Sequence, residues 1–146
     1  MRMVEQIAAM LATILTQREA GYIDKARREM DAHSLKSIGL TIDKLKKLSP
    51  QAVAQLLDES PAMRPVRAIT LAELLLVDAE LTDEQGNASE SLASRVHACC
   101  LMADSIQALG SEDQAIYKAK LKATAEKLGE LRTHPYIGER LRRFEL

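Results

Sequence analysis

Three glycines, Gly21, Gly86 and Gly110, each end one long helical pattern just before another begins. Glycine suits the left-handed backbone that follows a helix end. A turn this short makes the second helix run back along the first, so that their apolar faces pack together. The chain is therefore predicted to be all-α, with six to seven helices in antiparallel pairs that form a stack or bundle.

The low aromatic content favours the same fold class. Aromatic residues make up 3% of the 146 residues, with no Trp, whereas apolar residues make up 47%. The core must then consist of Leu, Ile, Ala, Val and Met, which suits close packing of helices better than a β-sandwich. A chain of this length is expected to form a single domain.

Charge and cysteine content limit the partners and the setting. The chain carries 20 basic and 21 acidic side chains, for a net charge of −1, so no general attraction to nucleic acid is expected. No membrane span is predicted, because the apolar stretch 74–77 is far shorter than the ~20 residues needed. The side chains of Cys99 and Cys100 point about 100° apart on one helix, which disfavours a disulfide and predicts a reducing, cytoplasmic setting.

Apolar periodicity divides the single domain, residues 1–146, into sections. They are a first helix pair at 1–39, an irregular section of short helices at 40–64, three long helices at 65–132 and a short C-terminal helix at 135–146. The individual long helices are predicted at about 3–19, 22–38, 65–84, 88–109 and 112–132, with the final short one at 136–144. The helix at 65–84 is apolar around most of its circumference and should be the most buried.

Capping patterns support several of these boundaries. Ser49 followed by Pro50 is typical of a helix start. Asn87, with Glu90 three residues later, predicts a second cap. Gly110 is predicted as a C-terminal glycine, directly followed by a capping box of Ser111 and Gln114.

The spacing around these turns resembles that of tetratricopeptide-like helical hairpins. In such hairpins a turn glycine is followed five residues later by Ala and four further on by a large apolar residue. Gly21, Ala26 and Met30 match this pattern, and Gly110 with Ala115 matches its first two positions. The layout up to about residue 131 is similar to a bacterial family of uncharacterised helical proteins with tetratricopeptide-like folds. This resemblance implies a fold but no assigned activity.

Two departures limit what the resemblance carries over. The three glycines are unevenly spaced, whereas a regular array repeats at about 34 residues, and large aromatic residues are scarce. No peptide-binding residue is therefore transferred from tetratricopeptide domains.

His97 and Cys100 are the best candidates for metal or catalytic chemistry. They lie three residues apart on one helix and would give two metal ligands, whereas a structural site needs about four and a catalytic one about three. A nucleophilic Cys99 or Cys100 would also need an activating base. A small enzyme or metal-binding protein that uses His97 and Cys100 stays an alternative, but no catalytic residue, metal or cofactor is predicted.

An acidic run has no basic residue between Arg67 and Arg95. It is either a surface for a cation or basic partner or, as we expect, a solvated face paired with neighbouring lysines. The lysines at 118, 120, 122 and 127 are expected to form a solubilising face. The acidic run consists of Glu73, Asp78, Glu80, Asp83, Glu84 and Glu90.

The C-terminal residues Arg140, Arg142 and Arg143 form a basic cluster beside Leu141 and Phe144. Such a cluster is typical of a weak membrane-surface or nucleic-acid binder, which stays a further alternative. Glu139 and Glu145 dilute the positive charge, so a packed terminal helix or a dimer contact is the expected role.

The sequence predicts a non-enzymatic protein-interaction or scaffold module that associates with a protein partner or as a homodimer. Helical stacks leave an end helix with apolar surface that must be capped or paired. The first helix is expected to provide this surface through Ile7, Leu11 and Ile14. The apolar residues 7–16 partly resemble a signal peptide, but a buried amphipathic helix is the prediction there.

Overall fold

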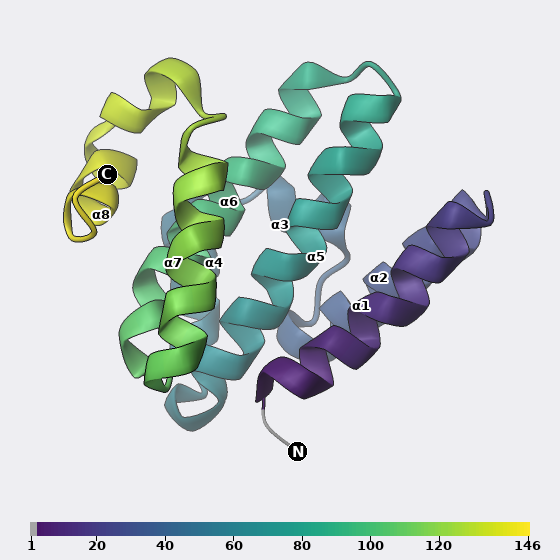
Figure 1. Ribbon diagram of the computed structural model, residues 1–146, viewed down its shortest axis with the longest axis horizontal. Coiled ribbons are helices and arrows are strands. Elements are labelled where there is room, and N and C mark those ends of the chain that lie inside the picture. Colours follow the sequence, from purple (N-terminus) through teal and green to yellow (C-terminus); the bar gives the residue numbers. More distant parts are fainter. Residues whose placement is uncertain (1–2) are drawn as a thin grey trace.

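The computed structural model describes residues 3–146, which contain no strand and are helical apart from short turns. The predicted all-α class is confirmed, and the long helices follow one another through tight turns (Figure 1). The described helices are α1 (Met3–Glu19), α2 (Ile23–Ile38), α3 (Ile42–Lys46), α4 (Pro50–Asp58), η1 (Pro61–Met63), α5 (Arg64–Glu84), α6 (Ala88–Ser105), η2 (Ile106–Ala108), α7 (Ser111–Ala125), η3 (Gly129–Thr133) and α8 (Pro135–Arg142), where η marks a short 3-10 helix.

The hairpin of α5 and α6 forms the centre of the molecule. Both helices are buried over most of their length, and they pack against each other more extensively than any other pair. Gly86, with a φ of 76°, makes the left-handed turn between them. Asn87 accepts a 3.3 Å hydrogen bond from the backbone N–H of Glu90. The predicted burial of the 65–84 helix and the predicted Asn87 cap are both confirmed.

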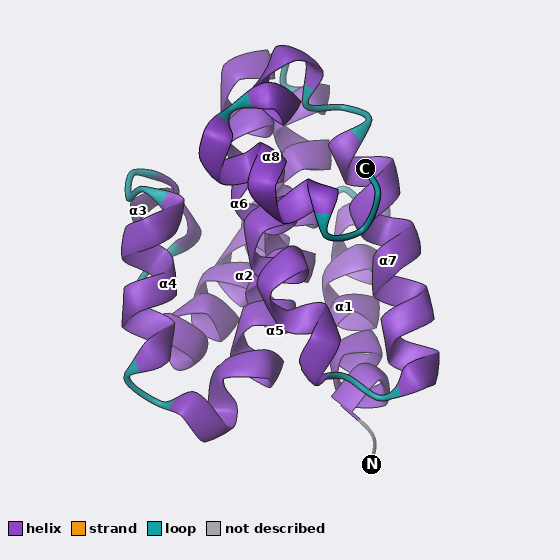
Figure 2. Ribbon diagram, turned by 90° about the vertical axis from the view of Figure 1, so that its left-hand side faces the viewer, coloured by secondary structure: helices purple, strands orange, loops and turns teal. Residues whose placement is uncertain are grey.

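The remaining helices cover this hairpin on both sides. Figure 2 shows α3 and α4 on one side of the central hairpin, and α1 and α7 on the other. In Figure 1, α1 and α7 stand on either side of α5. The helix α2 packs against both α1 and α5, and so joins the N-terminal pair to the centre.

The N-terminal pair follows its prediction closely. The helix α1 has the predicted bounds, and α2 begins one residue later than predicted, at Ile23. Gly21 makes the turn with a φ of 84°, and Ala26 and Met30 of α2 are buried in the core. Gly39 then ends α2 with a φ of 78°, as expected for a C-terminal glycine.

The irregular section forms a layer of the core. Ser49 accepts a 3.1 Å hydrogen bond from the backbone N–H of Ala52, and Pro50 is the first residue of α4, so the predicted cap is confirmed. Buried residues of α3 and α4 join the core, and α3 packs against α6 while α4 packs against α5 and α6. These buried residues are Ile42, Leu45, Val53 and Leu57.

The turn before α7 differs from the prediction. The helix α6 ends at Ser105, and the 3-10 helix η2 then leads into extended backbone at Leu109 and Gly110. Gly110 therefore has a φ of −65° and occupies the N-cap position of α7, so its prediction as a left-handed C-terminal glycine is wrong. The predicted capping box is also wrong, because the amide of Gln114 donates to the carbonyl of Leu109 at 2.8 Å.

The last long helix is shorter than predicted. The helix α7 ends at Ala125, and the chain then turns through Gly129, which has a φ of 59°, into η3. A residue with left-handed backbone cannot continue an α-helix, which explains why the predicted 112–132 helix breaks here. The predicted section of three long helices therefore consists of α5, α6 and a shorter α7.

The C-terminal helix α8 packs on α6. Ile137 and Leu141 of α8 are buried in the core. Gly138 faces the backbone of Arg132, since a β-carbon added there would lie 3.0 Å from its carbonyl oxygen. Within residues 3–146, no helix is both long and apolar enough to cross a membrane.

Candidate binding groove

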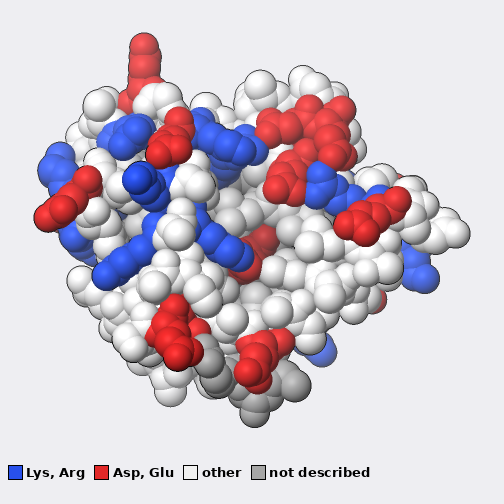
Figure 3. Space-filling model, in the orientation of Figure 1, with Lys and Arg blue, Asp and Glu red and all other residues white. Residues whose placement is uncertain are grey.

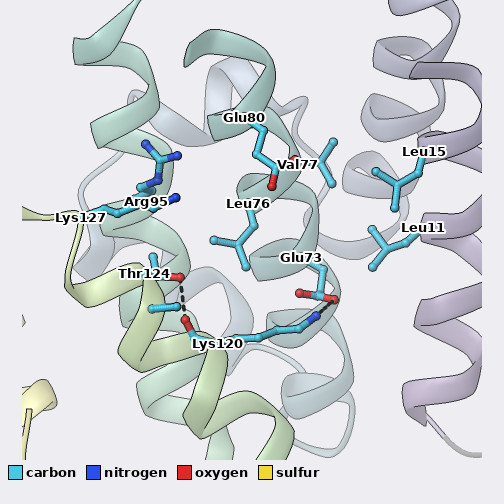
Figure 4. Close-up of a pocket in the computed structure, with 11 residues that line it drawn as sticks. Leu11, Leu15, Glu73, Leu76, Val77, Glu80, Arg95, Lys120, Thr124 and Lys127 are labelled. Carbon is cyan, nitrogen blue, oxygen red and sulfur yellow. Dashed lines mark hydrogen bonds and ion pairs between the residues drawn. The ribbon is translucent and has the colours of Figure 1, made fainter. Parts of the chain in front are cut away.

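A groove of about 330 Å³ lies over α5, between α1 and α7. Figure 3 shows a hollow in the middle of this face, bordered by charged side chains. In Figure 4, side chains from α1, α5, α6 and α7 and from the turn after α7 surround this space. They include Leu11 and Leu15 of α1, Leu76 and Val77 of α5, Arg95 of α6, Lys120 of α7, and Lys127 of the turn that follows α7.

The floor and one wall of the groove are aliphatic. Between residues 71 and 79 of α5, every side chain is buried except that of Leu76, which faces the groove. Leu11 and Leu15 lie one turn apart on α1, are half-buried and line the same space. The chain's own core therefore leaves these three leucines incompletely covered. Partly exposed apolar side chains gathered in a concave site are typical of a binding surface.

The α7 side of the groove is basic. The Nζ of Lys120 lies 2.6 Å from Oε2 of Glu73, whose side chain is only 5% exposed on the groove floor. Lys127 also lines the groove, and its positive charge contributes to the lowered pKa of Asp83 without a direct ion pair between the two. The lysines predicted to form a solubilising face therefore include two groove residues, Lys120 and Lys127.

Ion pairs also tie the ends of the central helices to their neighbours. The guanidinium group of Arg18, on α1, pairs with the carboxylates of Glu80 and Glu84. Arg95 of α6 pairs with Asp83 at 2.6 Å. Hydrogen bonding from Arg95, the largest effect, and from Ser91 lowers the pKa of Asp83.

The carboxylates of α5 are paired with cations from other elements. The expectation of a solvated face with neighbouring lysines is wrong for Glu73 and Asp78, because both side chains are buried. The expectation also named only lysines, whereas Arg18, Arg27 and Arg95 are partners as well. The pairs are Glu73 with Lys120, Asp78 with Arg27 and Lys46, Glu80 and Glu84 with Arg18, and Asp83 with Arg95.

Asp78 is the most enclosed of these carboxylates, with a side chain that is 1% exposed. Lys46 and Arg27 each approach it at 2.9 Å, and the hydroxyl of Ser94 donates to it at 2.6 Å. Burial by itself would raise the pKa of Asp78, but the hydrogen bonds from these three groups outweigh burial and lower it. The side chain of Lys46 is 4% exposed and also pairs with Glu90 at 2.7 Å.

The predicted interface on α1 is corrected by the structure. Ile7 is 4% exposed and Ile14 is fully buried, because both side chains face the chain's own core. They offer no surface to a second copy. Leu11 is half-buried and faces the groove instead, so only this member of the predicted set lies at a candidate binding site.

His97, Cys99 and Cys100 are enclosed in the core. Burial lowers the pKa of His97, and hydrogen bonding with the backbone of Lys46 and Leu48 offsets this only in part. Burial raises the pKa of both thiols to about 12, which leaves almost no thiolate at neutral pH. Within residues 3–146, no three His, Cys, Asp or Glu side chains come together as a set that would hold a metal ion.

The C-terminal basic cluster is largely used to dock α8. Arg140 pairs with Asp104 of α6 at 3.0 Å and lies 3.5 Å above the centre of the Tyr136 ring. Arg143 approaches the same carboxylate at 3.5 Å, and Arg142 and Arg143 are both exposed. The expected packing of a terminal helix is therefore what the structure shows.

The groove could not be located from the sequence. Its walls come from α1 and α7, which are separated by almost the whole chain, and no short motif joins them. The only local signal is at Leu76, an apolar residue on the side of the central helix where Glu73 and Glu80 also lie. That spacing indicates a half-exposed face but not what stands beside it.

Comparisons of this chain with models of protein families, with curated proteins and with solved structures found no match.

Proposed function

We propose that this protein is a non-enzymatic interaction module that binds a segment of a protein partner in the groove between α1 and α7. The observation that carries the proposal is the set of half-buried leucines at the groove, Leu11, Leu15 and Leu76. Their burial by a partner would be favourable, at about 25 cal/mol for each Å² of apolar surface covered. The charged border would then fix the orientation of the partner.

The surroundings of His97 and the cysteines support a non-enzymatic role. A nucleophile must be ionised and must be reached by its substrate. The thiol of Cys100 is 4% exposed and has a pKa raised to about 12, so it meets neither requirement. The two buried free cysteines also support the proposed reducing, cytoplasmic setting.

The antiparallel helix pairs support a tetratricopeptide-like relationship, which stays a proposal. Self-association also stays a proposal, but the burial of Ile7 and Ile14 leaves the groove as the surface on α1 that a second copy would use. Light scattering after size-exclusion chromatography at micromolar concentration tests it. A strict monomer would exclude the homodimer and leave a separate protein as the occupant.

The groove itself is tested by a matched pair of variants on α1. Leu11→Glu places a charge on the groove wall, whereas Thr13→Glu places the same charge at an exposed position that does not line the groove. Affinity capture from the native cells should recover a partner with the wild type and with Thr13→Glu, but not with Leu11→Glu. Thermal unfolding checks that both variants fold. Equal recovery by all three proteins would contradict the proposal.

A further inference from the structure

The lining of the groove restricts the kind of segment that fits it. Addition of a strand requires an exposed sheet edge, and residues 3–146 contain no strand. Proline-rich segments dock in grooves lined by aromatic rings, and the residues that line this groove include none. Aliphatic side chains between two helices are instead typical of sites that take the apolar face of an amphipathic helix.

The charges at the groove are uneven in a way that selects among such helices. Both carboxylates of the lining are already paired, Glu73 with Lys120 and Glu80 with Arg18. Lys120 cannot leave its partner cheaply, because the carboxylate of Glu73 would then be buried without a counter-charge. Lys127 is the lining cation with no carboxylate of residues 3–146 within ion-pair distance. Lys127 acts on Asp83 only through longer-range electrostatics, so the lining cation that is free to form a direct pair lies on the α7 side.

The wider surface extends this asymmetry. Figure 3 shows lysine and arginine side chains gathered to the left of the hollow, on the part of the molecule that holds α7 and α8 in Figure 1. Acidic side chains gather at the opposite upper edge. A helix lying in the groove would therefore gain from negative charge on the flank that faces α7.

Among residues 3–146, a second copy of this chain offers no helix with strongly exposed large apolar side chains at the spacing such a face needs. Its exposed large apolar side chains are spread over different elements, whereas a groove-binding helix needs them at spacings of three and four residues on one face. These exposed side chains are Tyr22, Leu35, Leu56, Met63 and Ile116. The occupant that fits is a different protein.

We infer that the partner segment is an amphipathic helix with an apolar face of leucine-like residues and acidic residues along the flank that lies against α7. This inference rests on the proposed function of the groove. Leu11, Leu15 and Leu76 receive the apolar face, and Lys127 pairs with a carboxylate of the flank. The pair is solvent-exposed, so it contributes to selection and to the rate of association more than to the total affinity.

A displayed library of helix-forming peptides tests the inference on the full-length protein. The peptides have about 16 residues, long enough to form helices, with charged and apolar positions varied at random. Those that also bind Leu11→Glu are removed before sequencing. The expected survivors carry apolar residues at helical spacing and acidic residues on one flank.

The charge of Lys127 is then reversed in Lys127→Glu, with Lys122→Glu as the matched control, because Lys122 is also exposed, lies nearby in the last turn of α7 and does not line the groove. For a selected peptide, Lys127→Glu should raise the Kd roughly fivefold at low salt, and Lys122→Glu less than roughly twofold. Equal effects of the two variants, or survivors with basic or neutral flanks, would overturn the inference but not the groove. A library with no survivor would overturn both.

Discussion

Glu73 and Asp78 are buried carboxylates little more than one turn apart on α5, yet they face different surroundings. Asp78 lies on the enclosed side, where its cation Lys46 is 4% exposed. Glu73 lies on the groove floor, where its cation Lys120 is 40% exposed. Both side chains of the first pair are almost completely shielded from water. In the second pair, Glu73 is shielded but Lys120 is partly exposed. The same chemistry thus holds the helices together on one side of α5 and lines the proposed binding groove on the other.

The largest effect is expected from removing the enclosed carboxylate. Asp78→Ala leaves Lys46 buried beside Arg27 with only Glu90 to neutralise it, so it should lower the free energy of unfolding by about 3–5 kcal/mol. Urea unfolding followed by circular dichroism measures this loss. Adding Lys46→Met to Asp78→Ala should recover part of the stability, because the unpaired charge is then gone. A loss below about 1 kcal/mol would mean that water reaches the site.

A pH-dependent effect is expected from His97 on the same enclosed side. Its folded pKa is lowered, so the unfolded chain binds a proton more readily. This contribution to stability is full above the ordinary pKa of about 6.5 and is lost as the pH falls below it, by up to about 1.4 kcal/mol per pH unit.

The variant His97→Leu isolates this effect. Urea unfolding at several pH values between 7 and 5 should show a smaller slope of stability against pH for the variant than for the wild type. Asp78 does not interfere, because its folded pKa is lowered from an ordinary value of about 3.9, and its contribution is lost only in more acidic solution. Identical slopes would show that His97 binds its proton as readily in the folded chain as in the unfolded chain.

A smaller loss is expected on the groove side. Glu73→Gln removes the charge of the carboxylate but keeps the shape of the side chain. The ammonium group of the half-exposed Lys120 can then be solvated by water instead. The free energy of unfolding should fall by about 1 kcal/mol or less. A loss as large as that of Asp78→Ala would place Lys120 in an enclosed site and remove the distinction between the two sides of α5.

The smallest effect on stability is expected at the border of the groove. Lys127→Glu changes an exposed side chain, so the free energy of unfolding should change by no more than about 0.5 kcal/mol. The melting temperature of this variant, measured beside that of Lys122→Glu, checks that its effect on peptide binding is not a folding defect. A markedly lower melting temperature would show that Lys127 has a structural partner.

Local features were predicted well from the sequence. The bounds of α1 and the caps at Ser49 and Asn87 depend on a few neighbouring residues, and all are found in the structure. The end of α7 was missed because apolar spacing continues through Leu128 and Leu131 after the backbone has turned. Periodicity reports the side that faces the core and continues across a short break in the helix.

The partners of the buried carboxylates could not be predicted in the same way. Nothing near Asp78 in the sequence indicates that Arg27 and Lys46 reach it, because these contacts arise from how α2 and α3 pack on α5. The predicted interface failed for a related reason. A stripe containing Ile7 and Ile14 looks the same whether it meets the chain's own core or a second molecule.

The contacts of Asp78 also bear on how the chain folds. Its partners come from α2, the end of α3 and α6, so a single carboxylate requires four helices to be in place at once. Detaching α2 or α3 alone would leave a buried ion with too few partners, which makes partly unfolded forms costly. The short helix α3, too small to persist by itself, should therefore exchange its backbone amide hydrogens only when α5 and α6 also open.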